Sequence, residues 1–432
     1  MPISSHISAA GTATDAGPLA FRMPVERLRL VLLWLMAFSG CFVFIEPGPY
    51  EITAALTVFV FAVTGLTLSR PLVPLIIMLV IYDVGFALAV LQVIGDSKAV
   101  IWVFISWYLS ITAIFFAAVL TQNTEARLNR IAHGYLAAAI LASVIAILAY
   151  FRLFGDHSDW FLKFGRARST FNDPNVLGAF LVFPGLLLLQ QILAGRVKTM
   201  LWSAAILFVI IAALLLSFSR GAWAQFAGAT VLQTVMTFII SRSDRERLRI
   251  GAIAVTGIVL LGVFIALLLS IDRIANIFDV RATLTQDYDV EHLGRFGRWW
   301  AGFLLALERP LGIGPLQFGT LFPEDPHNTF LNAFMSGGWI VGFIYPAIIV
   351  TTLVLGFRTI FIATPWRMTY LAVYCAFAST AFEGAIVDID HWRHFFLLLG
   401  CVWGLTIAAQ NHRRRAPSQG PPPALPAFAY IN

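Results

Sequence analysis

Charged side chains are scarce in this chain of 432 residues. Asp, Glu, Lys and Arg make up 12% of it, whereas soluble domains carry about 25%. Hydrophobic residues make up 59%, and a soluble fold of this length has too little interior to bury so many of them. The scarcity of charge therefore excludes an ordinary soluble protein and predicts a chain that crosses a membrane several times.

Cysteine is also rare, since only Cys41, Cys375 and Cys401 are present and each lies in an apolar run. Such isolated thiols supply neither a disulfide framework nor a thiolate metal site. A net charge of +6 is found in nucleic-acid-binding proteins, but in a membrane chain it is more typical of basic cytoplasmic loops. We therefore expect no nucleic-acid partner.

Twelve apolar windows approach the length of about 20 residues that a membrane-spanning helix needs. They lie at 29–45, 52–69, 72–94, 99–121, 131–151, 176–193, 199–217, 221–240, 250–270, 328–354, 368–387 and 394–410. The fold class that they predict is all-α, a polytopic membrane helix bundle of about 12 transmembrane helices in one domain, residues 27–410. We expect residues 1–26 and the basic, Pro-rich residues 411–432 to be disordered tails.

The distribution of Lys and Arg predicts the orientation of these spans. With a cytoplasmic N-terminus, the inside segments hold 17 of the 29 basic residues and the short outside loops hold three. This asymmetry places both termini in the cytoplasm. The other nine basic residues lie in two longer outer loops, 152–175 and 271–327. Long loops are translocated regardless of charge, but arginines at the outer face also suit a substrate that carries phosphates.

The outer loop before the sixth window carries two arginines, Arg166 and Arg168, close to a helix start. Arginine side chains beside free backbone N–H groups make an anion site. Asp173 and Asn175 flank a proline and are also suited to capping the helix that follows. The loop therefore has both a structural and a phosphate-binding interpretation.

Arg220 follows the seventh window in a turn so short that it must lie within the membrane interface. An arginine there is costly unless it is paired. It could snorkel to the surface, but a substrate anion is the better interpretation.

The long outer loop, residues 271–327, contains a helical pattern over residues 293–307, with the aromatic side chains on one side of the expected helix. This pattern predicts a helix lying along the membrane surface, with Arg295 and Arg298 facing the outer leaflet. His327 stands at the outer mouth of the next span, where a neutral imidazole can accept a proton near pH 7. A capped interfacial histidine is the structural alternative.

Two sets of residues that contain carboxylates are alternatives to His327 for a catalytic role. One is the loop between the last two windows, where four side chains could bind a divalent metal: Asp388, Asp390, His391 and His394. The neighbouring Arg393 favours a salt-bridged structural corner instead. The other group, Glu46 and Glu51, flanks the short first outer loop and has little room to act as a base.

Two acidic residues, Asp83 and Glu383, lie within the predicted spans. Intramembrane acids are functional candidates by default, and a proton-coupled transporter or flippase would use them as a relay. Against this interpretation, most of the unexpected charge lies in outer loops rather than at mid-membrane, and the sequence shows no internal repeat.

The order of the motifs resembles the O-antigen ligase and polymerase superfamily. Ser-x-Ser-Arg-Gly at 217–221 is followed by Arg295-x-x-x-Trp299, by Pro-Leu-Gly-Ile-Gly at 310–314 and by His327-Asn328-x-x-Leu331. The similarity covers roughly residues 165–345. It implies a bacterial inner-membrane glycosyltransferase of the GT-C type that takes a glycan from undecaprenyl diphosphate at the periplasmic face, with no cofactor and no metal.

The resemblance also assigns roles to individual residues. His327 would be the catalytic base, and Arg220 and Arg295 would hold the diphosphate. Arg298, Arg166 and Arg168 are further candidates for diphosphate binding because of their own positions in the outer loops. Asn328, Asp173 and Asn175 would be supporting residues. The acceptor would be lipid A core in a ligase or a growing polysaccharide in a polymerase. Many ligases have an acid in the segment that here reads Met-Ser-Gly-Gly, residues 335–338, so both activities stay open.

Overall fold

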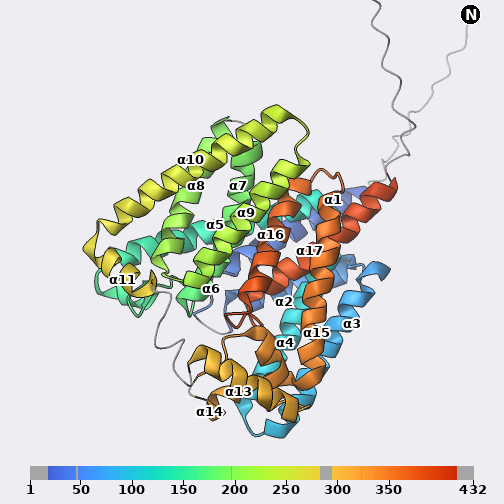
Figure 1. Ribbon diagram of the computed structural model, residues 1–432. Coiled ribbons are helices and arrows are strands. Elements are labelled where there is room, and N and C mark those ends of the chain that lie inside the picture. Colours follow the sequence, from blue (N-terminus) through green and yellow to red (C-terminus); the bar gives the residue numbers. More distant parts are fainter. Residues whose placement is uncertain (1–17, 45–46, 196, 283–293, 323, 416–432) are drawn as a thin grey trace, which may run out of the picture.

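The computed structural model describes residues 18–44, 47–195, 197–282, 294–322 and 324–415, and most of these residues are helical (Figure 1). Each predicted window overlaps a helix. In chain order these helices are α1 (Pro18–Ser39), α2 (Pro49–Gly65), α3 (Val73–Val90), α4 (Ser97–Val119), α5 (Thr124–Tyr150), α6 (Pro174–Phe180) with α7 (Val182–Ala194), α8 (Val197–Leu216), α9 (Arg220–Ile240), α10 (Asp244–Leu269), α15 (Thr329–Ile360), α16 (Arg367–Glu383) and α17 (Arg393–Arg415).

Shorter elements extend or connect these helices. They are η1 (Arg70–Leu72), η2 (Leu91–Val93), η3 (Gly155–Phe161), β1 (Leu162–Lys163), β2 (Arg166–Ala167), α11 (Asp272–Ala282), α13 (Arg295–Glu308) and α14 (Phe318–Leu321). The two strands pair in antiparallel fashion, with Leu162 opposite Ala167. They place Arg166 in a tight hairpin just before α6.

Nine helical segments in the described ranges are long and apolar enough to cross a membrane. Of the other predicted windows, α2 and α16 have 17 residues each, and the remaining window corresponds to α1. The all-α polytopic membrane bundle predicted from the sequence is therefore confirmed as a fold class.

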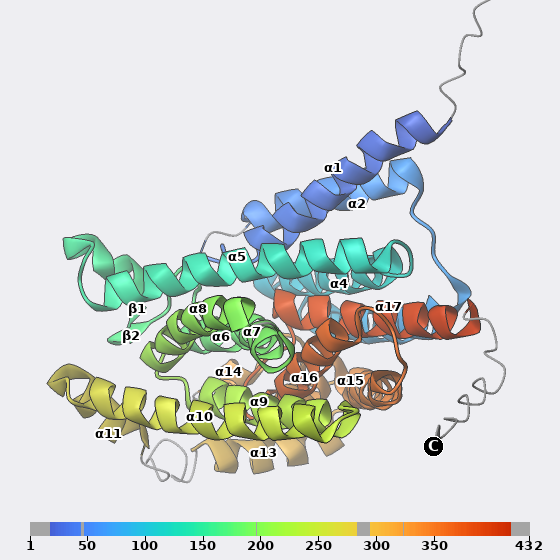
Figure 2. The same ribbon diagram turned by 90° about the horizontal axis from the view of Figure 1, so that it is seen from above.

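The helices differ strongly in how far they are buried. In an apolar 18-residue window of α17, 89% of the residues are buried, whereas in the corresponding window of α10 none is buried. In Figure 2, α1 and α2 lie on one side of the molecule and α10 on the other, with α16 and α17 between them. Because α10 presents apolar residues to the outside along its length, lipid is the environment that its sequence requires.

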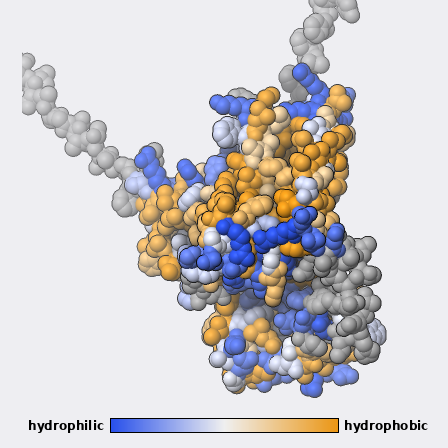
Figure 3. Space-filling model, turned by 90° about the vertical axis from the view of Figure 1, so that its left-hand side faces the viewer, coloured by the Kyte–Doolittle hydropathy of each residue, from blue (hydrophilic) through white to orange (hydrophobic). Residues whose placement is uncertain are grey.

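One face of the molecule shows how polar and apolar surface are separated. Hydrophobic side chains gather over its upper part, and hydrophilic side chains form a band across its middle (Figure 3). Such extended apolar surface is not tolerated in water by a monomeric soluble protein. The surface therefore agrees with the all-α membrane fold.

The helix α15 is interrupted at Gly338, whose φ of 68° is in the left-handed region. The turn that contains Gly312 (φ 72°) packs into this break. Ile313 N–H donates to Met335 O at 2.7 Å, and Trp339 N–H donates to Pro310 O at 2.8 Å. A side chain at either glycine would collide with the backbone of the other segment, so the long outer loop is fixed to the half of α15 that begins beside His327.

Candidate active site

The start of α15 is fixed to the loop between α16 and α17. Thr329 N–H donates to Gly384 O at 2.7 Å, and the Thr329 hydroxyl donates to Val387 O at 2.9 Å. Ile389 N–H in turn donates to the Thr329 hydroxyl at 2.9 Å. The end of the bundle that carries this junction is called the outer end below, and the opposite end is called the inner end.

His327 lies against Asp388 at this junction. Its Nδ1 is 3.5 Å from Asp388 Oδ2, and the N–H of Asn328 donates to Asp388 Oδ1 at 3.1 Å. Asn328 also caps α15 by accepting from Leu331 N–H at 3.1 Å. His327 has a φ of 48°, which is costly for a residue with a side chain and is common at functional sites. The imidazole is therefore held in a defined position while 39% of its side chain stays exposed.

The carboxyl group of Asp388 is shifted away from its ordinary acidity. Burial raises the pKa of Asp388, the nearby Asp390 carboxylate raises it further, and the hydrogen bond from His327 opposes both effects. A partly desolvated carboxyl group beside an imidazole is an arrangement that orients the imidazole and stabilises its protonated form.

The rest of this loop is tied to neighbouring helices. Asn332 Nδ2 donates to Asp390 Oδ2 at 2.9 Å, His391 Nε2 is 3.1 Å from Trp102 O, and Arg393 forms an ion pair with Glu51. Within the described ranges, no group of three or more His, Cys, Asp or Glu side chains is placed to hold a metal ion.

Arg220 is the first residue of α9 and lies beside the same loop. Ser219 caps this helix by accepting from Ala222 N–H at 3.3 Å. The next residue, Gly221, packs against the side chains of Glu383 and Val387. The starts of α9 and α15, with Arg220 and His327, therefore both border the segment that runs from Glu383 to Asp390.

Arg166 reaches the same turn from the preceding hairpin. It is 7% exposed, and it donates to Ser217 O through Nε and to Asn175 Oδ1 through a terminal nitrogen, both at 2.8 Å. Asp173 caps α6 by accepting from Asn175 N–H at 2.9 Å, which is the structural role that the sequence suggested for it. These contacts fix the turn before Arg220.

The other predicted arginines have different surroundings. Arg168 is half-buried and donates to Trp160 O at 2.8 Å. Arg298 is 3% exposed and pairs with Glu324 at 3.2 Å, so the prediction that it faces the outer leaflet is wrong. Arg298 lies on the buried side of α13, where a charged group needs a partner. The exposed side of this helix is apolar and consists of Phe296, Trp300, Phe303, Leu304 and Leu307.

Two predicted residues cannot be placed as side chains. Arg295 begins α13, but its side chain is outside the described part of the structure, as is the whole of Glu46. Glu51 is described, and its carboxylate accepts from Gly48 N–H at 2.7 Å and pairs with Arg393. The roles in diphosphate binding stay predictions for all five arginines.

The contact between His327 and Asp388 was not anticipated from the sequence. The two residues are far apart in the chain, and the Asp-x-Asp pattern gave only a metal or structural interpretation. From the sequence, Glu383 is a candidate only for a transporter relay, yet this last residue of α16 is 4% exposed and packs against Gly221 at the start of α9. With its nitrogen oriented toward this carboxyl group, the Gln225 amide donates to Glu383 Oε2 at 2.7 Å.

An apolar pocket of about 330 Å³ lies between α9 and α16, next to Glu383. Its lining is Gly221, Ala224, Gln225, Gly228, Ala229, Leu232, Ala378, Ser379, Phe382, Glu383 and Ile386. Phe382 is 73% exposed, so the pocket borders the outer surface of the bundle rather than its core.

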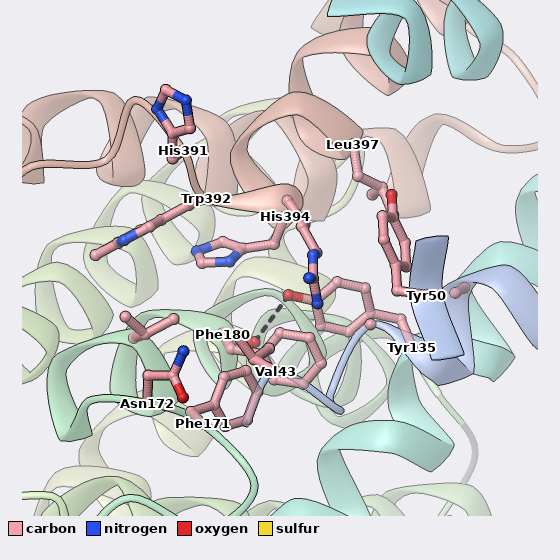
Figure 4. Close-up of a pocket in the computed structure, with 14 residues that line it drawn as sticks. Val43, Tyr50, Tyr135, Phe171, Asn172, Phe180, His391, Trp392, His394 and Leu397 are labelled. Carbon is pink, nitrogen blue, oxygen red and sulfur yellow. Dashed lines mark hydrogen bonds between the residues drawn. The ribbon is translucent and has the colours of Figure 1, made fainter. Parts of the chain in front are cut away.

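A second cavity of about 130 Å³ lies behind the loop that carries Asp388. His391, Trp392 and His394 stand on one side of it, and Tyr135 and Phe180 on the other (Figure 4). The Tyr135 hydroxyl donates to Phe180 O at 3.1 Å. His394 is buried, and its Nε2 has no hydrogen-bond partner among the described residues. The cavity has room and polar groups for several water molecules.

Comparison with known proteins finds a family match for part of the chain, which includes some residues of this site but not Asp388 or Arg166. Residues 204–346 match the family described as O-antigen ligase, a stretch that runs from α8 into α15 and includes Arg220, Arg298 and His327. No curated protein matches the chain. The family match agrees with the order of motifs at 217–221, 295–299, 310–314 and 327–331, so residues 204–346 are similar to the O-antigen ligase family both in sequence and in the placement of these motifs.

Proposed function

We propose that the protein transfers a glycan from undecaprenyl diphosphate to a saccharide acceptor at the periplasmic face of the bacterial inner membrane. The match of residues 204–346 to the O-antigen ligase family supports O-antigen ligase or polymerase activity in general. One observation carries the more specific proposal: Arg220 and the contact between His327 and Asp388 border the same loop at the outer end.

The reaction that fits this arrangement is an inverting displacement. His327 takes the proton of an acceptor hydroxyl, and the hydroxyl oxygen bonds to the anomeric carbon on the face opposite the diphosphate. The bond between that carbon and the diphosphate oxygen breaks, and its electron pair leaves with undecaprenyl diphosphate. Asp388 accepts from Nδ1–H of His327, which leaves Nε2 as the atom that receives the proton.

Arginines would stabilise the negative charge of the leaving diphosphate. Arg220 and Arg295 are the principal candidates, with Arg298, Arg166 and Arg168 nearby in the outer segments. Preorganised cations placed where charge develops lower a barrier most effectively, and the guanidinium group matches phosphate oxygens in geometry. With this charge compensation the transfer requires no metal ion.

The apolar pocket between α9 and α16 supports a lipid-linked donor. It begins at Gly221, next to Arg220, and it borders the outer surface of the bundle. A prenyl chain lying there would place its diphosphate beside the start of α9, where backbone N–H groups and Arg220 favour an anion.

The acceptor is lipid A core in the ligase form of the proposal and a growing O-antigen or exopolysaccharide chain in the polymerase form. The polymerase is retained because residues 335–338, Met-Ser-Gly-Gly, offer no acidic side chain. In both forms the two termini are cytoplasmic and residues 271–327 are periplasmic.

Gel analysis of surface glycans in a deletion strain tests the proposal. Loss of lipopolysaccharide-bound chains with carrier-linked polymer retained indicates a ligase. Single repeats, or absent exopolysaccharide, indicate a polymerase. Unchanged surface glycans in the deletion strain would contradict both, and carrier-linked glycan trapped on the cytoplasmic side would favour a flippase.

A further inference from the structure

A basic pocket of about 280 Å³ lies at the inner end of the bundle, where the mechanism uses no residue. Three arginines from three segments line it: Arg242 after α9, Arg249 in α10 and Arg367 at the start of α16. One acidic side chain, Glu246, lies among them. The pocket thus has an excess of positive charge where four helix ends meet.

Part of the pocket's lining is apolar. Leu193 at the end of α7, Ile240 at the end of α9, Ile250 in α10 and Met368 in α16 contribute to it, beside the hydroxyl groups of Thr237 and Ser241. The pocket therefore combines arginines with apolar side chains from four helices. It therefore suits a ligand that has an anionic head and an apolar tail.

The arginines of the pocket are not neutralised by the surrounding protein. Within the part of the chain that the structure describes, Arg242 and Arg367 form no ion pair, and Arg249 donates to the backbone carbonyl of Gly195. Glu246 accepts from the backbone N–H of Arg242 at 3.2 Å. Arg242 and Arg249 are exposed and Arg367 is half-buried, so their guanidinium groups are accessible to an anion, which they can bind through charge-assisted hydrogen bonds.

The pocket also lies where α10 joins the bundle. None of the most apolar window of α10 is buried, and Ile250, which is 4% exposed, is the buried residue of this helix. A ligand held between Arg249 of α10, Arg367 of α16 and the end of α7 would therefore add packing contacts to the start of α10, a helix that has few contacts with the rest of the bundle.

We propose that this pocket binds an anionic phospholipid, with the headgroup phosphate on Arg242, Arg249 and Arg367 and an acyl chain against the apolar side chains. The lipid fastens the start of α10 to α7 and α16. The distribution of Lys and Arg assigns this end to the cytoplasmic leaflet, which is rich in anionic lipids. The proposal does not rest on the glycan-transfer function.

Lipid titration of the purified full-length protein tests the proposal. Detergent-solubilised protein is mixed with phosphatidylglycerol, with phosphatidylcholine or with inorganic phosphate, and bound lipid is counted by native mass spectrometry. We expect retention of phosphatidylglycerol but not of phosphatidylcholine. Each arginine near an anionic headgroup contributes about a fivefold gain in affinity, so Arg242→Gln, Arg249→Gln and Arg367→Gln together should weaken binding by roughly 100-fold.

Arg245→Gln is the matched control, since Arg245 lies in the same segment of α10, is exposed and does not line the pocket. It should leave lipid binding unchanged. Equal loss in this control, equal retention of phosphatidylcholine, or saturation of the pocket by inorganic phosphate alone would overturn the proposal. If the triple variant does not fold, Arg249→Gln replaces it with an expected loss of about fivefold, and no loss in that variant contradicts the proposal.

Discussion

The two ends of α9 use arginine in opposite ways. At the outer end, charged groups meet partners within the protein: His327 contacts Asp388, and Arg298 pairs with Glu324. At the inner end, Arg242 and Arg367 line a pocket that also contains Glu246, but their guanidinium groups form no ion pair among the described residues. The same residue type at a membrane interface can therefore complete an internal network or create a site for an external anion.

Because of this difference, substitutions at the two ends of α9 should change different properties of the protein. In the proposed mechanism, the contacts at the outer end hold His327 in place before substrate arrives, which is the condition for electrostatic catalysis. Changes there should cost turnover more than stability. Changes at the inner end should affect lipid binding and leave the chemistry intact.

The largest effect is expected from His327→Ala. If His327 is the base, its removal should lower glycan transfer by about 10³-fold, within the range of 10² to 10⁴ that general-base catalysis contributes. Affinity for the lipid-linked donor should stay nearly unchanged. The assay measures transfer of carrier-linked glycan by membranes that contain the variant. Near-normal transfer would show that His327 is not the base, and Glu46 and Glu51 would be the next residues to examine.

Arg220→Lys should have the next largest effect. Lysine keeps the charge but loses the planar, two-point contact with phosphate oxygens, and loss of one such donor typically costs about 10²-fold in rate. Steady-state kinetics should show the loss in kcat or in the KM for donor. Arg245→Lys at the inner end is the control, and a similar loss there would mean that the comparison between the two ends fails.

Asp388→Asn should reduce transfer by about tenfold, which corresponds to roughly 1.4 kcal/mol of lost stabilisation of the protonated base. The pH profile separates this role from a merely structural one. Because a carboxylate stabilises protonated imidazole, its removal should shift the acid limb of kcat/KM to lower pH. A variant with lower activity but an unshifted acid limb would show that Asp388 only holds the loop.

The smallest effect on transfer is expected at an ion pair far from His327, where a substitution should change stability instead. Burial raises the pKa of Glu26, but hydrogen bonds and charge from Arg127, with help from Asn123 and Arg29, outweigh it and leave the pKa below the ordinary 4.5. Glu26 therefore contributes stability at neutral pH that is lost as the pH falls below 4.5.

Glu26→Gln should accordingly lower the free energy of unfolding by about 2 kcal/mol at pH 7, because Arg127 is 3% exposed and would lose its partner. The difference from the unchanged protein should shrink as the pH falls from 4.5 toward 3. Thermal unfolding across this range measures it. Asp159→Asn, which removes the exposed partner of Arg152, serves as the control and should leave the midpoint unchanged.

The sequence predicts where the helices lie along the chain but not which helix faces contact each other. All twelve apolar windows overlap helices because hydrophobic length is a local property that the membrane itself selects. The inward direction of Arg298 and the contact between His327 and Asp388 depend on which helix faces meet, and no local pattern encodes that. The pocket at Arg242, Arg249 and Arg367 likewise arises from separate segments that are each unremarkable alone.

The break in α15 at Gly338 has a consequence for exchanging parts between related proteins. The Pro310–Gly314 turn supplies hydrogen bonds that the interrupted helix would otherwise lack, so the loop and the outer half of α15 behave as one hydrogen-bonded module. A chimera whose foreign outer loop has a different backbone path at this turn would leave Met335 O and Trp339 N–H without their hydrogen-bond partners. Junctions placed after Trp339 keep both sides of these hydrogen bonds in one parent sequence and should give folded hybrids.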